Sequence, residues 1–101
     1  METFNDVINS DQPVLVDFFA TWCQPCKVMH PILEQVKDVL GDRIRIIMVD
    51  VDKYGATASR YGIQSVPTLM LFRHGDVLWR TSGVMQRAEL LATIDPFLRQ
   101  M

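Results

Sequence analysis

Several features that would assign a chain to a common functional class are scarce in this sequence. Only two of the 101 residues are cysteines, too few for a secreted domain that is held together by disulfides. The ten basic residues are scattered and the net charge is −2, which argues against nucleic acid or an acidic membrane surface as the main partner. No apolar run reaches the length that spans a membrane, and there are no repeats or low-complexity tracts.

The first ten residues, METFNDVINS, carry acidic side chains and lack the basic start and apolar run of an export signal. We therefore expect a cytoplasmic protein, in a compartment where a structural disulfide would not persist. Earlier removal of an export signal stays open as an alternative. Apolar residues are plentiful, at 49% of the chain, which is enough for one core and predicts a single domain over residues 1–101.

Residues 13–20 are apolar on both faces apart from Asp17, which predicts a strand that is covered on both sides, and residues 44–51 are predicted to form a second strand. Between them, the apolar residues from Cys26 to Leu40 recur at helical spacing, and Gly41 suits the end of a helix. A strand, a helix and a strand in this order form a right-handed unit with parallel strands.

Together the patterns predict an α/β fold, a mixed four-stranded sheet flanked by helices on both faces. Residues 67–72 and 77–82 have strand character and flank RHGD, whose Gly75 marks a hairpin turn, so these strands should be antiparallel. The remaining elements are helices: residues 1–10, residues 54–61, and a C-terminal helix that Pro96 is expected to kink or fray.

The two cysteines, Cys23 and Cys26, are separated by Gln24 and Pro25 at the start of the first long helix. We expect Cys23 at the N-cap, where unpaired backbone N–H groups and the helix dipole favour a thiolate. Cys26 lies one turn further in and should be more buried. Pro25 fits the first turn because its missing N–H costs nothing there, and Lys27 adds positive charge nearby. This arrangement is typical of a dithiol that exchanges electrons.

A zinc site is the main alternative for the cysteine pair. Cys23, Cys26 and His30 form a C-x2-C-x3-H run, with His74 as a fourth ligand. A structural zinc site usually brings a second close-spaced pair of ligands, which this chain lacks. His74 belongs to the predicted hairpin turn, so we expect no metal site. His30 is interpreted as a histidine of the helix surface.

Asp17 stands among apolar residues in the first predicted strand. Its carboxylate is therefore expected to be buried and to titrate at a raised pH. Proteins tend to keep such a group where a proton has to move. Because the strand leads to the cysteine loop, Asp17 is predicted to relay a proton to the inner thiol. The alternative is that its side chain reaches solvent at the edge of the strand.

Over nearly its whole length the sequence resembles the thioredoxin family. The stretch VDFFATWCQPCKVMHPILEQV resembles the family's active-site strand, loop and helix, and YGIQSVPTLMLFRHGDVLWRTSG resembles its second half. The resemblance implies the thioredoxin fold and a protein-disulfide reductase. It also implies that the chain binds no cofactor of its own and receives electrons from a thioredoxin-reductase-type flavoprotein.

The resemblance gives roles to single residues. Cys23 resembles the attacking thiolate, Cys26 the resolving thiol, and Asp17 the buried proton acceptor. Pro67 resembles the family's cis-proline, and Val66 before it resembles the residue whose backbone binds an extended substrate. The substrate-binding residues implied in this way are Trp22, Gln24, Pro25, Val66, Pro67, Gly83 and Val84.

Three features depart from the family's pattern. Gln24 replaces the usual glycine between the cysteines, which bears on the redox potential. Met48 aligns with the lysine that many members place beside the buried aspartate. The family's first strand has no counterpart, so residues 44–51 are expected to form an edge of the sheet. We expect either a weak dimer through this edge or cover by the N-terminal segment.

The leading prediction is a cytoplasmic reductase in which Cys23 attacks a substrate disulfide and Cys26 resolves the mixed disulfide. Two alternatives stay open: a docking module of the same fold whose redox pair is incidental, and an exported oxidase or isomerase. The run WCQPCK counts against the docking module. The lack of a histidine between the cysteines counts against the oxidase or isomerase.

Overall fold

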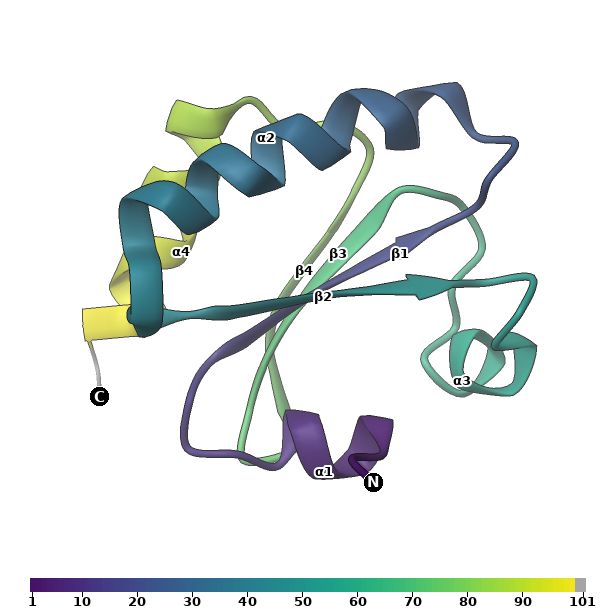
Figure 1. The fold of residues 1–101 in the computed structure, drawn as a ribbon, viewed down its shortest axis with the longest axis horizontal. Helices are drawn as coiled ribbons and strands as arrows, with labels where there is room; N and C mark the ends of the chain where they lie inside the picture. Colours follow the sequence, from purple (N-terminus) through teal and green to yellow (C-terminus); the bar gives the residue numbers. More distant parts are fainter. Residues whose placement is uncertain (100–101) are drawn as a thin grey trace.

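The computed structural model describes residues 1–99, and a four-stranded mixed sheet forms its centre (Figure 1). β1 and β2 run parallel, whereas β1 and β3, and β3 and β4, are antiparallel. The strand order is β2-β1-β3-β4. All four predicted strands are confirmed to within one residue at each end: β1 (Val14–Phe19), β2 (Arg45–Asp50), β3 (Thr68–Arg73) and β4 (Asp76–Ser82).

Helices cover both faces of the sheet, as predicted. In Figure 1, α2 (Gln24–Leu40) and α4 (Arg87–Arg99) lie on one side, and α1 (Phe4–Ile8) and α3 (Gly55–Arg60) lie on the other. Pro96 lies inside α4, which continues past it, so the helix does not end at the proline. Within residues 1–99, no helix is both long and apolar enough to cross a membrane.

Two apolar clusters, one on each face of the sheet, hold these helices in place. Successive residues of a strand point to opposite faces. Leu15 accordingly joins the cluster under α2 and α4, while Val16 and Phe18 join the cluster beside α1, where the ring of Phe4 packs against Phe18. β1 is therefore buried on both sides, and Asp17 shares the face of Leu15, beneath α2.

The turn between β3 and β4 is joined to the end of α1. The N–H groups of His74 and Gly75 donate hydrogen bonds to the carbonyl oxygens of Ser10 and Ile8, at 3.1 and 2.8 Å. Both turn residues have positive φ, 54° for His74 and 81° for Gly75. This contact fixes one end of β3, and the loop that contains Pro67 lies at the other end.

β2 is an outer strand of the described sheet, as expected, and N-terminal residues flank part of it. The guanidinium of Arg45 donates to both carboxylate oxygens of Glu2, at 2.7 and 2.9 Å. Met48, further along the strand, is 46% exposed. The N-terminal segment thus contacts Arg45 and borders a cavity together with Met48, whose side chain it leaves partly exposed.

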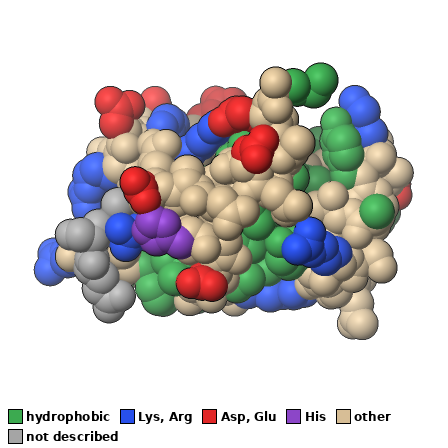
Figure 2. All heavy atoms as spheres, turned by 90° about the horizontal axis from the view of Figure 1, so that it is seen from below, with side chains coloured by type: hydrophobic (Ala, Val, Ile, Leu, Met, Phe, Trp, Pro, Cys, Tyr) green, Lys and Arg blue, Asp and Glu red, His purple; other side chains and the backbone are tan. Residues whose placement is uncertain are grey.

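The charged side chains do not gather by sign on the face that Figure 2 presents, where basic and acidic groups are interspersed. This agrees with the scattered basic residues of the sequence and its net charge of −2. Such a face lacks the stripe of positive charge that follows a nucleic-acid backbone.

Candidate active site

Cys23 and Cys26 are joined by a disulfide at the start of α2. Cys23 is the N-cap residue, as predicted, and its sulfur accepts a hydrogen bond of 3.2 Å from the backbone N–H of Cys26. Gln24 and Pro25 occupy the first helical turn, so the N–H that Pro25 lacks is one that the helix would leave unpaired. The N–H groups of this turn and the helix dipole therefore favour negative charge on the Cys23 sulfur.

The burial of the two cysteines differs from expectation in one respect. Cys26 is fully buried, as predicted, yet Cys23 is also only 3% exposed in this oxidised form. The disulfide packs with Ala20, Phe19 and Val66 in a small apolar cluster. A partner sulfur therefore has to reach Cys23 across an apolar surface and does not meet a freely exposed side chain.

Two loops border the disulfide on one side. Trp22 precedes Cys23, is 68% exposed, and donates a hydrogen bond of 2.9 Å from its indole Nε1 to the carboxylate of Asp52. The peptide bond between Val66 and Pro67 is cis, as the resemblance implied. The carbonyl oxygen of Val66 lies 3.6 Å from the sulfur of Cys23. A small cavity of about 130 Å³ lies between Trp22 and Val66.

The main chain of Val66 has no backbone partner within residues 1–99, neither for its N–H nor for its carbonyl oxygen. The neighbouring loop is fixed, because the N–H of Gly83 donates to the carbonyl oxygen of Pro67 at 2.9 Å. Gly83 has a φ of 93°, which favours glycine, and Val84 beside it is 38% exposed. An extended peptide can therefore pair with Val66 much as a strand pairs with a sheet edge.

Asp17 is completely buried, and neither of its carboxylate oxygens has a hydrogen-bond partner. Burial disfavours the charged form and raises the pKa of Asp17 to about 7. The predicted burial is confirmed, and the alternative of a solvated side chain is wrong. A carboxyl group with a pKa near the working pH can both accept and release a proton.

His30 lies at the border of the surface of α2, so its interpretation as a histidine of the helix surface is only partly right. Its Nε2 lies 3.4 Å from Oδ2 of Asp17, and its side chain is 30% exposed. The ring packs edge-to-face against Phe19, with centroids 5.3 Å apart. His30 follows Cys26 by four residues, and residues at this spacing share a helix face. The contact therefore places Asp17 beneath the face that carries Cys26.

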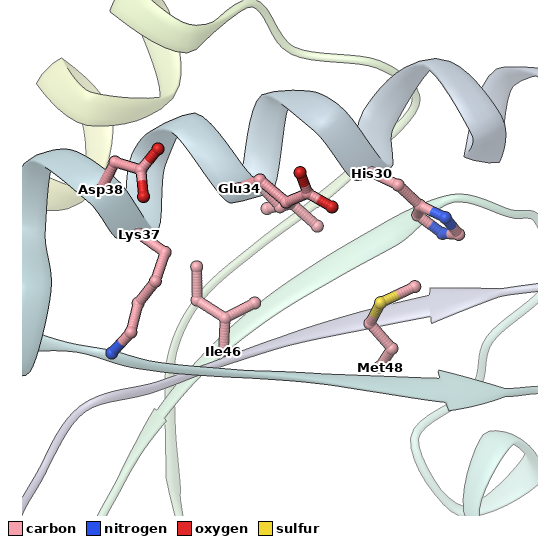
Figure 3. A pocket seen from close by; sticks show the side chains of 7 residues that line it. His30, Glu34, Lys37, Asp38, Ile46 and Met48 are labelled. Atoms are coloured by element: carbon pink, nitrogen blue, oxygen red, sulfur yellow. The ribbon is translucent and has the colours of Figure 1, made fainter.

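A cavity of about 450 Å³ opens between α2 and β2, beside this pair (Figure 3). Its lining includes His30, Glu34 and Lys37 from α2 and Ile46 and Met48 from β2. Figure 3 shows His30 and Met48 at the same end of the cavity. Met48 also pairs with Asp17 in the register of β1 and β2, so the position of the family's lysine is next to the buried carboxylate.

The histidines of the zinc alternative lie in different parts of the fold. His30 contacts Asp17 on the cysteine side of the sheet, whereas Nδ1 of His74 lies 3.4 Å from Asp11, beside the β3–β4 turn. In the described part of the chain, no group of three or more His, Cys, Asp or Glu side chains is placed to hold a metal.

Comparison with known proteins agrees with this geometry. The family model described as thioredoxin matches residues 1–96. A thioredoxin-like protein of Synechocystis sp. is 51% identical over 88% of this chain and 85% of its own. The thioredoxin of Rickettsia typhi is 40% identical over 90% of this chain and 87% of its own. Thioredoxin Y1, chloroplastic, of Arabidopsis thaliana is 40% identical over 97% of this chain, which spans 58% of that relative's length.

Proposed function

Because the chain belongs to the thioredoxin family, we propose that Cys23 and Cys26 carry out the thiol–disulfide exchange of that family. The family and the cysteine pair make the chain a thiol–disulfide oxidoreductase with disulfide reductase activity. The observation that carries the roles of the two sulfurs is the N-cap position of Cys23, with the N–H of Cys26 aimed at its sulfur.

In the proposed cycle, the thiolate of reduced Cys23 attacks a substrate disulfide, and one substrate sulfur leaves as a thiolate. The thiol of Cys26 then loses its proton and attacks the Cys23 sulfur of the mixed disulfide. The second substrate sulfur leaves, and the Cys23–Cys26 disulfide of this structure is the product. The substrate gains the two electrons that the dithiol loses.

Asp17 is the proposed acceptor for the proton of Cys26. Its burial beneath α2 and its pKa of about 7 support this role, because a base with that pKa is available near neutral pH. The contact with His30, one helical turn from Cys26, supports the required proximity.

We further infer that clients bind as extended segments across the surface beside the disulfide. The backbone of Val66 would supply main-chain hydrogen bonds, and the lack of backbone partners for its N–H and carbonyl oxygen within residues 1–99 supports this role. Pro67 would hold that backbone in place, with the cis bond before it. The border of this surface would consist of Trp22, Gln24, Pro25, Gly83 and Val84.

A thioredoxin-reductase-type flavoprotein is the proposed electron donor, so the chain acts as an electron carrier between that enzyme and its clients. We also propose a cytoplasmic location, because a reducing compartment would keep the Cys23–Cys26 pair available as a dithiol. The word chloroplastic in the name of one relative describes that relative.

Insulin reduction tests the proposal. The wild-type chain, supplied with a chemical dithiol reductant, should reduce insulin, whereas a Cys23→Ser variant should not. A Cys26→Ser variant should accumulate a mixed disulfide with insulin through Cys23. If the wild-type chain binds clients without reducing insulin, the docking module is the better reading. If the wild-type chain oxidises reduced clients faster than it reduces insulin, the oxidase or isomerase is the better interpretation.

A further inference from the structure

Asp17 carries a charge at the moment when it is ready to accept a proton, and nothing in its immediate surroundings solvates that charge. The side chain is fully buried, and both oxygens lack hydrogen-bond partners. A buried carboxylate without compensation is costly. Within residues 1–99, the only basic side chain within 4.0 Å of Asp17 is His30, with its Nε2 at 3.4 Å from Oδ2.

The strands on either side of Asp17 bring no charge to it. Met48 of β2 and Leu69 of β3 are its partners in the sheet register. From α2, His30 contacts the carboxylate and packs edge-to-face with Phe19, and Cys26 precedes His30 by one helical turn.

The other charged groups near His30 lie along the cavity between α2 and β2 (Figure 3). Glu34, Lys37 and Asp38 line it from α2. The ammonium of Lys37 is engaged elsewhere, because it donates to the carbonyl oxygens of Gly41 and Ile44 at 2.9 and 2.7 Å. His30 is therefore the group placed to respond to the charge on Asp17.

We propose that His30 is a positioning residue of the resolving step: its imidazole pairs with the Asp17 carboxylate and sets how readily Asp17 takes the proton of Cys26. The inference rests on the proposed role of Asp17 as the proton acceptor. Before the transfer, the protonated imidazole of His30 stabilises the carboxylate of Asp17. The proton then moves from the sulfur of Cys26 to that carboxylate.

The physical basis is a competition between burial and a nearby positive charge. Burial raises the pKa of a carboxyl group, and a cation within about 4–6 Å lowers it. The imidazole of His30, at 3.4 Å from the carboxylate, lies within the distance over which a positive charge acts on a carboxyl group. The separation of 3.4 Å is longer than a typical N–H···O bond and leaves room for the contact to shorten when both groups are charged.

The test is a titration of the Asp17 carboxyl carbon by NMR in the reduced protein, with His30→Gln and His30→Leu as variants. His30→Gln keeps a polar group at the site, so it guards against loss of the fold. In both variants the pKa of Asp17 should rise by about one pH unit, a roughly tenfold gain in proton affinity. The pH profile for resolution of the mixed disulfide, measured in chains that retain Cys26, should move upward by the same amount.

A rescue variant separates charge from packing. Met48→Lys in the His30→Leu background places an ammonium on β2, in register with Asp17, and should return the titration of Asp17 toward the wild-type position. The matched control is His74→Leu. It removes the other histidine that lies 3.4 Å from an aspartate and should leave the pKa of Asp17 unchanged.

An unchanged titration of Asp17 in both His30 variants would overturn the pairing. A shifted titration with an unchanged pH profile for mixed-disulfide resolution would overturn the positioning role. Neither readout depends on whether the wild-type chain reduces insulin, which tests the proposed function separately.

Discussion

The indole of Trp22 is tied to the carboxylate of Asp52 by a hydrogen bond of 2.9 Å, between residues that are 30 positions apart in the chain. The turn that carries Asp52 is itself fixed, because the carboxylate of Asp50 accepts the N–H groups of Asp52 and Lys53. A large aromatic side chain that is 68% exposed is thereby held in one orientation beside the disulfide.

We expect Asp52→Ala to weaken client binding more than the chemical step. Loss of the acceptor releases the indole, and a hydrogen bond to a charged group contributes about 1.5–3 kcal/mol before exposure reduces it. The KM for insulin should rise a few-fold while kcat changes little. Asp52→Asn, which retains an acceptor oxygen, is the matched control. Equal KM values for Asp52→Ala and the wild type would show that the bond does not position Trp22 for clients.

Cys23 should react before Cys26 with an alkylating reagent. The helix dipole and the N–H of Cys26 act on the Cys23 sulfur, and Cys26 is fully buried. In the reduced protein, limiting iodoacetamide near neutral pH should place most of the label on Cys23, as read by peptide mass mapping. Equal labelling, or labelling of Cys26 first, would contradict the assignment of the nucleophile.

Asp17→Asn should make the protein more stable relative to wild type as the pH rises. The pKa of Asp17 is about 7 in the folded protein, above its ordinary value of 3.8. Well below pH 3.8 the carboxyl is neutral in both the folded and the unfolded state. Between pH 4 and 7 the unfolded chain ionises first, so the wild type loses stability through this window, by roughly 4 kcal/mol at most.

Urea unfolding of the wild type and the Asn variant at pH 4 and pH 8 measures this effect. The difference in unfolding free energy should favour the variant by more at pH 8 than at pH 4. The same variant should resolve mixed disulfides more slowly. A difference that is the same at both pH values would mean that the carboxylate is solvated, and the proton-relay role would lose its main support.

The outer edge of β2 should mediate weak self-association once its N-terminal cover is removed. Glu2→Ala breaks the contact with Arg45 and leaves the strand edge next to the exposed Met48 more accessible. Sedimentation velocity should show more dimer for Glu2→Ala than for the wild type. Adding Met48→Lys to Glu2→Ala should reverse the change, since a charge on an edge strand opposes pairing. Strictly monomeric chains with fast amide exchange along residues 44–51 would exclude both association and cover.

The sequence predicts the fold well because its signals are local. β1 is apolar on both faces, and this pattern identified both the strand and the burial of Asp17. The position of Cys23 at the helix start follows in the same way from the helical periodicity after Cys26. The cis bond before Pro67 followed only from the family resemblance, because roughly 5% of such bonds are cis in folded proteins.

The parts of the site that the sequence did not predict are contacts between distant segments. His30 lies at the border of the buried face of α2, and its contact with Asp17 depends on how the helix rests on β1. The bond from Trp22 to Asp52 joins two loops with no shared pattern. The near-complete burial of Cys23 depends on the loop that carries Val66, which is 43 positions away.

The ring that the disulfide closes spans a sequence separation of only 3, at the start of one helix. Chain-entropy arguments give so short a crosslink about 2 kcal/mol of stabilisation through the unfolded state. Oxidation and unfolding form a closed thermodynamic cycle. The difference in unfolding free energy between the oxidised and the reduced chain therefore equals the difference between the free energies of forming the disulfide in the folded and in the unfolded chain. Two unfolding curves, one for each redox form, therefore measure how far folding displaces the reduction potential, at 30 mV for about 1.4 kcal/mol.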